Sequence, residues 1–176
     1  MLGAVPTPRC TATDAGSGPN GCSVVVSGGK ANGVGTRTLV ATATDKAGNT
    51  STSRRSFRVV YRFAGFAQPV NASGPMSVFK KGSTVRVRFR LTDSKGRTVT
   101  SGSAPTWLTP VRGAKKPGKV NEAVSRAKPD EGSVFRSRSG FYDYRWGTAK
   151  AKPGRSYRLG VRLDDGTTYT VLVVVR

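Results

Sequence analysis

Strict alternation of apolar and cationic side chains marks residues 85–91, which read Val-Arg-Val-Arg-Phe-Arg-Leu. Successive side chains of a β-strand point to opposite faces of its sheet, so a period of two residues predicts a strand with one buried face. We expect the apolar residues to face a core, while Arg86, Arg88 and Arg90 face solvent. The stretch Asp-Ser-Lys-Gly that begins at residue 93 then predicts a turn into a return strand at residues 97–99.

Short β-branched segments recur on both sides of this strand, separated by Gly, Pro, Asn and Asp, and this pattern is typical of an all-β protein. Four strands are expected before it, at residues 9–15, 23–27, 38–44 and 57–61. Three more are expected near the end of the chain, at residues 140–146, 156–163 and 168–175. Asp165-Gly166 lies between the last two, and this dipeptide fits a type I′ hairpin turn.

Two segments of the remaining sequence are expected to be irregular. Residues 62–83 contain scattered Gly and Pro and are expected to form a connector, and residues 109–131 are expected to form a long exposed loop. Within that loop, residues 120–127 fit one short helix, which Pro129 would end. The chain is therefore predicted to hold two modules, 1–61 and 62–176. Because a full sandwich has about seven strands, the first module is expected to be truncated at its N-terminal side.

The net charge is +21, from 30 Lys and Arg against 9 Asp and Glu. Most of the excess lies in the second module, because residues 1–61 carry only seven basic and two acidic residues. A charge of this size attracts polyanions but does not say which one. Compositional bias of a GC-rich genome is the alternative explanation, and the sequence leaves both open.

A cationic face is the sharpest binding candidate. Arg86, Arg88 and Arg90 share one side of a predicted strand, and Arg158 and Arg162 share one side of another. If these strands are neighbours, they form one basic surface, to which the loop adds Lys115, Lys116 and Lys119. The alternative is a solvated sheet face on which arginine stems cover apolar surface.

Cys10 and Cys22 are the only cysteines, and a turn-rich spacer separates them. A disulfide across a loop of this size stabilises by about 2–3 kcal/mol and lasts outside a reducing cytosol. Metal binding is the alternative, but two thiols in a chain without histidine make a poor zinc site.

The residues argue against catalysis and against a cofactor. Without histidine, Ser-His and Cys-His nucleophiles are excluded. Glycine-rich stretches at 16–21 and 113–119 lack the strand–loop–helix context of a nucleotide site, so we expect no cofactor. Asp14, Asp45 and Asn49 are weak calcium candidates, because calcium takes six to eight oxygens and Asp and Asn in turns need no metal.

Residues 63–175 resemble the PxKF domain, a small β-sandwich-like module near the C-terminal ends of large exported bacterial proteins. The resemblance rests on the opening Phe-Ala-Gly-Phe-Ala-Gln-Pro-Val at residues 63–70, on Lys81-Gly82, on Phe-Tyr-Asp-Tyr-Arg-Trp at residues 141–146 and on the closing Leu-Asp-Asp-Gly at residues 163–166. The naming motif departs from the family, because residues 86–89 read Arg-Val-Arg-Phe.

The first module is similar to the C-terminal half of bacterial immunoglobulin-like repeats. This similarity rests on Cys10, Asp14 and Cys22 with the glycines between them, and on Ala-Thr-Ala-Thr-Asp at residues 41–45 followed by Gly48-Asn49. The two resemblances imply two small immunoglobulin-like β-sandwich modules in tandem, and neither implies a catalytic activity.

These observations predict a non-catalytic structural or accessory module of an exported, cell-envelope-associated bacterial protein. The alternative is a polyanion-binding module for wall polymer, glycan or nucleic acid. The expected partners are anionic cell-wall polymers and other domains of a longer parent chain, with no small-molecule substrate. No apolar stretch is long enough for a membrane span. The first six residues do not resemble a signal peptide, so an extracellular or wall-associated location requires an export signal upstream.

Overall fold

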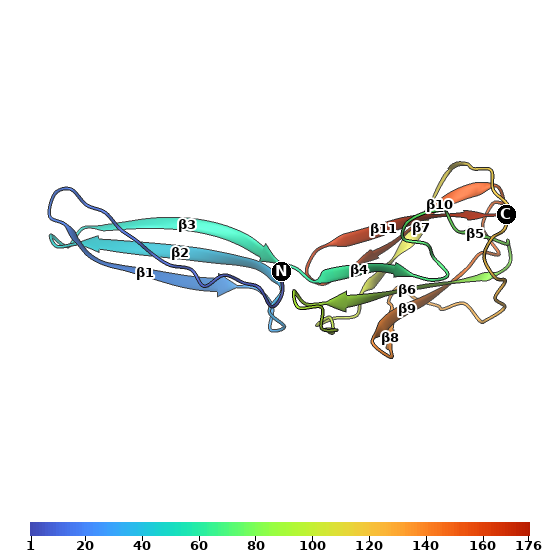
Figure 1. Ribbon diagram of the computed structural model, residues 1–176, viewed down its shortest axis with the longest axis horizontal. Helices are drawn as coiled ribbons and strands as arrows, with labels where there is room; N and C mark the ends of the chain where they lie inside the picture. Colours follow the sequence, from blue (N-terminus) through green and yellow to red (C-terminus); the bar gives the residue numbers. More distant parts are fainter.

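The computed structural model describes residues 1–176 and consists of strands joined by turns and loops, which confirms the all-β class (Figure 1). The strands form one three-stranded sheet and two four-stranded sheets. They are β1 Pro19–Gly28, β2 Gly35–Asp45, β3 Thr50–Val59, β4 Arg62–Ala67, β5 Val78–Phe79, β6 Thr84–Thr92, β7 Thr106–Lys115, β8 Arg136–Arg138, β9 Phe141–Gly147, β10 Arg155–Arg162 and β11 Thr168–Val175.

The first module is a single antiparallel sheet in the order β1-β2-β3 (Figure 1). Its central strand β2 pairs along its length with both neighbours, and no second sheet covers either face. Three strands form where four were expected, and the strand predicted at residues 9–15 is wrong. That segment makes no backbone hydrogen bond to the sheet.

The second module is a β-sandwich whose two sheets have the orders β4-β6-β9-β8 and β5-β11-β10-β7. Every pairing is antiparallel except the short parallel pair of β5 and β11. With β4 and β5 taken as the two halves of a first strand A, these are the A-B-E-D and C-F-G sheets of the immunoglobulin fold.

The core lies between the two sheets of the sandwich. The four apolar residues of the alternating stretch, Val85, Val87, Phe89 and Leu91, are fully buried, which confirms the predicted inward face of β6. The β10 strand supplies Leu159 and Val161 from the opposite sheet. Alternation in the sequence therefore located the centre of the core correctly.

Two further contacts are typical of immunoglobulin-like sandwiches. Trp107 on β7 is buried and stacks on Tyr144 with ring centroids 4.3 Å apart. The hydroxyl of Tyr157, near the start of β10, accepts a hydrogen bond from the Lys152 amide at 2.6 Å, which ties the strand to the preceding corner. Both cysteines lie in the first module, so no disulfide joins the two sheets of the sandwich.

The two segments expected to be irregular contain strands. The predicted connector at residues 62–83 holds β4 and β5, because Phe66 and Val78 fill the core. The predicted loop at residues 109–131 begins with the second half of β7 and contains no helix. Instead of forming helical bonds, its backbone pairs with other segments: the Ser125 carbonyl accepts the Thr84 amide, and the Asn121 amide donates to the Val78 carbonyl.

The turns also differ from expectation. Between β10 and β11 only Gly166 has a positive φ, of 84°, so Asp165-Gly166 does not form a type I′ turn. Type I′ geometry occurs instead at Ser139-Gly140, where φ is 47° and 74° and where the turn joins β8 to β9. The return strand expected at residues 97–99 is reduced to one isolated bridge between Thr92 and Thr98.

Candidate functional site

The outer face of the β4-β6-β9-β8 sheet carries rows of arginine side chains. Arg86 and Arg88 of β6 pair in register with Arg145 and Asp143 of β9, and Asp143 in turn pairs with Arg136 of β8. Because the inward positions of β6 are filled by the core, its alternate arginines must point outward. The orientation predicted for the β6 arginines is thus the one observed.

One end of this face is hollowed, with a volume of about 340 Å³. Residues 125–130, near the end of the long loop, form one wall of this hollow, and the sheet forms its floor. We call it the arginine hollow, and its lining residues are Arg86, Ser125, Ala127, Asp130, Arg136, Arg138, Asp143 and Arg145.

Two aspartates with buried side chains hold three of the four arginines of the hollow. Asp143 forms an ion pair with Arg86 Nε, and its side chain is only 8 % exposed. Asp130 accepts the Arg145 amide at 2.9 Å and an Arg145 guanidinium nitrogen at 3.1 Å, and it lies 3.9 Å from Arg136. Buried carboxylates that hold guanidinium groups in place reduce the side-chain entropy that a ligand would otherwise have to restrict.

Arg138 is the one arginine of the hollow that forms no ion pair. Four arginines and two aspartates leave the hollow with a net positive charge. A guanidinium has five N–H donors in a planar fork, and each ion pair here engages one or two of them. The hollow therefore retains unsatisfied donors of the type that bind phosphate and carboxylate groups in bidentate geometry.

Cation–π contacts cover Phe141 of β9, which pairs with Arg138 of the hollow. The guanidinium carbons of Arg88 and Arg90 lie 4.8 Å and 4.3 Å from the centroid of the Phe141 ring. Arg88 Nε also donates to the Gln68 carbonyl at 3.2 Å. The ring of Phe141 is thus already occupied by two cations.

The basic surface expected from the sequence is divided between opposite sides of the sandwich. Arg158 and Arg162 lie on β10, in the other sheet, and Lys115 ends β7 in that same sheet. Lys116 and Lys119 continue from β7 into the loop. The prediction of one continuous basic surface is therefore wrong. Alternation along a strand indicates which side of its own sheet a residue faces, but it does not indicate to which of the two sheets the strand belongs.

The calcium candidates gather at the tip of the first module. Asp14, Asp45 and Asn49 line a common hollow of about 210 Å³. Asp45 accepts the backbone and side-chain amides of Asn49 at 2.8 and 2.7 Å, and Asp14 accepts the Gly16 amide. These hydrogen bonds lower the pKa of Asp45 against the opposing effect of desolvation, with the Asn49 side chain as the largest cause. The carboxylates stabilise two turns, and the structure contains no group of three His, Cys, Asp or Glu side chains that could hold a metal ion.

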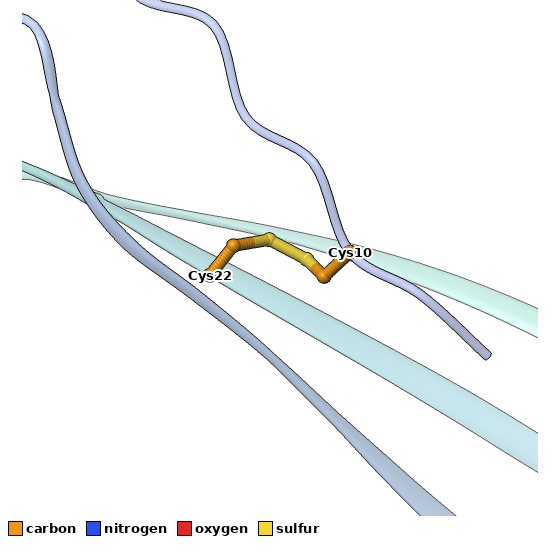
Figure 2. Close-up of a disulfide and its surroundings, with 2 residues drawn as sticks. All are labelled: Cys10 and Cys22. Carbon is orange, nitrogen blue, oxygen red and sulfur yellow. A yellow bond between two sulfur atoms is a disulfide. The ribbon is translucent and has the colours of Figure 1, made fainter. Parts of the chain in front are cut away.

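Cys10 and Cys22 form the expected disulfide (Figure 2). Their Cα atoms are 5.7 Å apart, within the usual range for a bridge. The segment around Cys10 has no strand pairing of its own, so the disulfide is what attaches it to β1 of the sheet.

The junction between the modules is built around Asp164, a residue that no sequence pattern connects with the first module. Its carboxylate accepts hydrogen bonds from Asn32 Nδ2 at 3.0 Å, from the Ser101 hydroxyl at 2.7 Å and from the Gly102 amide at 3.0 Å. Asn32 belongs to the loop between β1 and β2, whereas Ser101 and Gly102 belong to the sandwich. Desolvation acts to raise the pKa of Asp164, but these hydrogen bonds lower it below its usual value.

Tyr61 completes the junction. Its hydroxyl accepts the Asn32 amide at 2.7 Å, and its backbone amide donates to Asp165 Oδ2 at 2.9 Å. Burial, together with the nearby charge of Asp164, raises the pKa of Tyr61 to about 12. Val34, from the same loop as Asn32, is fully buried in the sandwich core. The first module is therefore anchored by both apolar packing and hydrogen bonds.

Sequence comparisons give no further assignment: no protein-family model matches the chain, and no curated protein does. A solved structure of titin Ig tandem domains is similar at 15 % identity, with a TM-score of 0.30. The match covers 81 % of this chain and 61 % of that one. We therefore take the fold from the strand topology described above. No helix in the structure is of a kind that would cross a membrane.

Proposed function

We propose that the chain is a non-catalytic structural module of an exported, cell-envelope-associated bacterial protein. It holds its three-stranded sheet in a fixed orientation on the sandwich, as a spacer between other domains of a longer parent chain. The observation that carries this proposal is the Asp164 junction, in which one carboxylate accepts hydrogen bonds from both modules. Flexibly linked modules would not bury Val34 or bind Tyr61 to Asp165.

The disulfide supports an exported setting, because such bonds persist in oxidising compartments. The chemistry of the arginine hollow supports a role without acid–base catalysis. Its two acids are held in ion pairs, and the chain contains no histidine.

Relaxation of backbone ¹⁵N nuclei tests the spacer role in the intact chain. Amides of β2 and of β10 should report one anisotropic tumbling of a single elongated body. Two separate rotational correlation times would show that the modules move independently and would overturn the proposal.

A second candidate function is polyanion binding by the arginine-rich face of the β4-β6-β9-β8 sheet. It is favoured by the concentration of arginines at the hollow, where two buried aspartates orient them. Binding that depends on these contacts should weaken steeply with salt, because each neutralised phosphate releases counterions. A salt-independent affinity for a polyanion such as polyphosphate would exclude this function.

A further inference from the structure

The geometry points to the arginine hollow as a binding site for an extended polyol-phosphate chain, a phosphodiester polymer without bases. This inference rests on the second candidate function and names its ligand. The site would take successive phosphates along β8, β9 and β6 rather than one isolated anion.

The first step of the argument is orientation. Arg86 and Arg145 are held by Asp143 and Asp130, whose side chains are 8 % and 5 % exposed. A guanidinium that is already fixed offers its remaining donors at little entropic cost. Arg138 has no internal partner, so it is free to engage a ligand.

The second step is spacing. The register places Arg86 beside Arg145, and the next outward row holds Arg88, Asp143 and Arg136. A further row holds Arg138 beside Phe141. Outward residues of one strand are two positions apart, so adjacent rows lie about 7 Å from each other. An extended phosphodiester chain carries one charge per repeat at a separation of this order, and its successive phosphates would meet successive rows.

The third step is the absence of a free aromatic platform on this face. Proteins that bind single-stranded nucleic acid stack bases on exposed aromatic rings. The aromatic ring at this position, Phe141, is covered by Arg88 and Arg90. Trp107 and Tyr144 are stacked on each other and buried in the core. The face thus offers donors for phosphates and no surface for bases, which favours a polymer of simple polyol units.

A matched pair of double variants tests this inference in the full chain. Arg136→Gln with Arg138→Gln removes two charges from the hollow, and Arg158→Gln with Arg162→Gln removes two charges from the opposite sheet. The probes are a synthetic poly(glycerol phosphate) oligomer, a single-stranded oligonucleotide with the same number of phosphates, and inorganic phosphate. Circular dichroism melting of both variants verifies that these exposed substitutions leave the fold intact.

The wild-type chain should bind the polyol-phosphate oligomer more tightly than either other probe. The hollow variant should lose at least about tenfold in affinity, and its slope of log K against log salt should fall by about 1.5, since each lost phosphate contact contributes about 0.7–0.9. The control variant should change affinity less than twofold.

Three results would overturn the inference, each in a different way. Equal losses in both double variants would mean that bulk charge binds the polymer, with no preference for the hollow or for the face that carries it. Tighter binding of the oligonucleotide would assign the face to nucleic acid. No binding of any polymer by the wild-type chain would defeat the inference and the second candidate function together.

Discussion

Asn32 Nδ2 lies 3.0 Å from Asp164 Oδ2, although 132 residues separate the two in the chain. The hydrogen bond joins the loop between β1 and β2 to the turn between β10 and β11. It therefore attaches the first module to a hairpin near the other end of the sequence.

Replacing Asp164 by Asn should weaken this junction. Asn is isosteric but uncharged, so Asn32 and Gly102 would donate to a neutral amide oxygen in place of a carboxylate oxygen. Hydrogen bonds to a charged group contribute about 1.5–3 kcal/mol and neutral ones about 0.5–1.5 kcal/mol, so we expect a loss of about 1–2 kcal/mol of unfolding free energy. Urea denaturation measures the loss. In D164N, the ¹⁵N relaxation of β2 amides should also indicate faster tumbling than that of β10 amides. The control is Glu131→Gln, at a side chain that is 89 % exposed. Equal stability of D164N and wild type would mean that the junction does not depend on this carboxylate.

Acid should loosen the same contact. Because the pKa of Asp164 is lowered in the folded state by hydrogen bonds from Ser101 and Asn32, which outweigh desolvation, the ionised form is favoured on folding. Its stabilisation is fully present above the unfolded pKa of about 4 and is lost as the pH falls through the lower folded value. Unfolding free energies measured between about pH 5 and pH 2 should fall with a shallower slope for D164N. Parallel pH profiles of the two proteins would contradict this origin of the acid sensitivity.

Removing the disulfide should destabilise one module selectively. The double variant Cys10→Ser with Cys22→Ser should lose about 2–3 kcal/mol, as expected for the release of a short closed loop. Hydrogen exchange should accelerate at the amides of β1 and remain unchanged at those of β10. A reducing agent should reproduce the effect in the wild-type chain and have none on the variant. Faster exchange throughout the sandwich would show instead that the two modules unfold as one unit.

The free edges of the first sheet should differ in their tendency to self-associate. The β3 edge carries Arg54, Arg55 and Arg58, and charges of this kind protect an exposed edge from pairing. The β1 edge carries no charge, and its Val25 is 63 % exposed. Sedimentation should show less self-association for Val25→Lys than for wild type. The double variant Arg54→Thr with Arg55→Thr should associate more, and the reverse order would disprove the protective role of these arginines.

Local periodicity explains which parts of the fold were predictable. In residues 85–91 each inward side chain is apolar and each outward one is arginine, so the pattern determines both the strand and its orientation. The β10 and β11 strands were found for the same reason. The β5 strand has only two residues, and β8 is exposed along its length with the sequence Arg-Ser-Arg, so neither carries a periodic signal. Such strands form because a neighbour in space pairs with them.

The candidate site was predictable only in part for a related reason. The outward direction of Arg86 follows from its own strand. Its neighbours Arg136 and Arg145 depend on the β8–β9 hairpin and on strand order, which no local pattern specifies. The ion pairs with Asp130 and Asp143 depend on the same long-range register. The two aspartates appear in the sequence as isolated acids in a basic background.

The place of Tyr61 has a practical consequence for protein engineering. Only Val60 lies between this residue and the end of β3, and β4 begins at the next residue, Arg62, so no linker separates the modules at the boundary. Cutting the chain there would separate the Tyr61 amide from Asp165, to which it donates a hydrogen bond. It would also expose the part of the sandwich core against which Val34 packs. A fusion of this protein to another scaffold should therefore carry both modules together as a single unit.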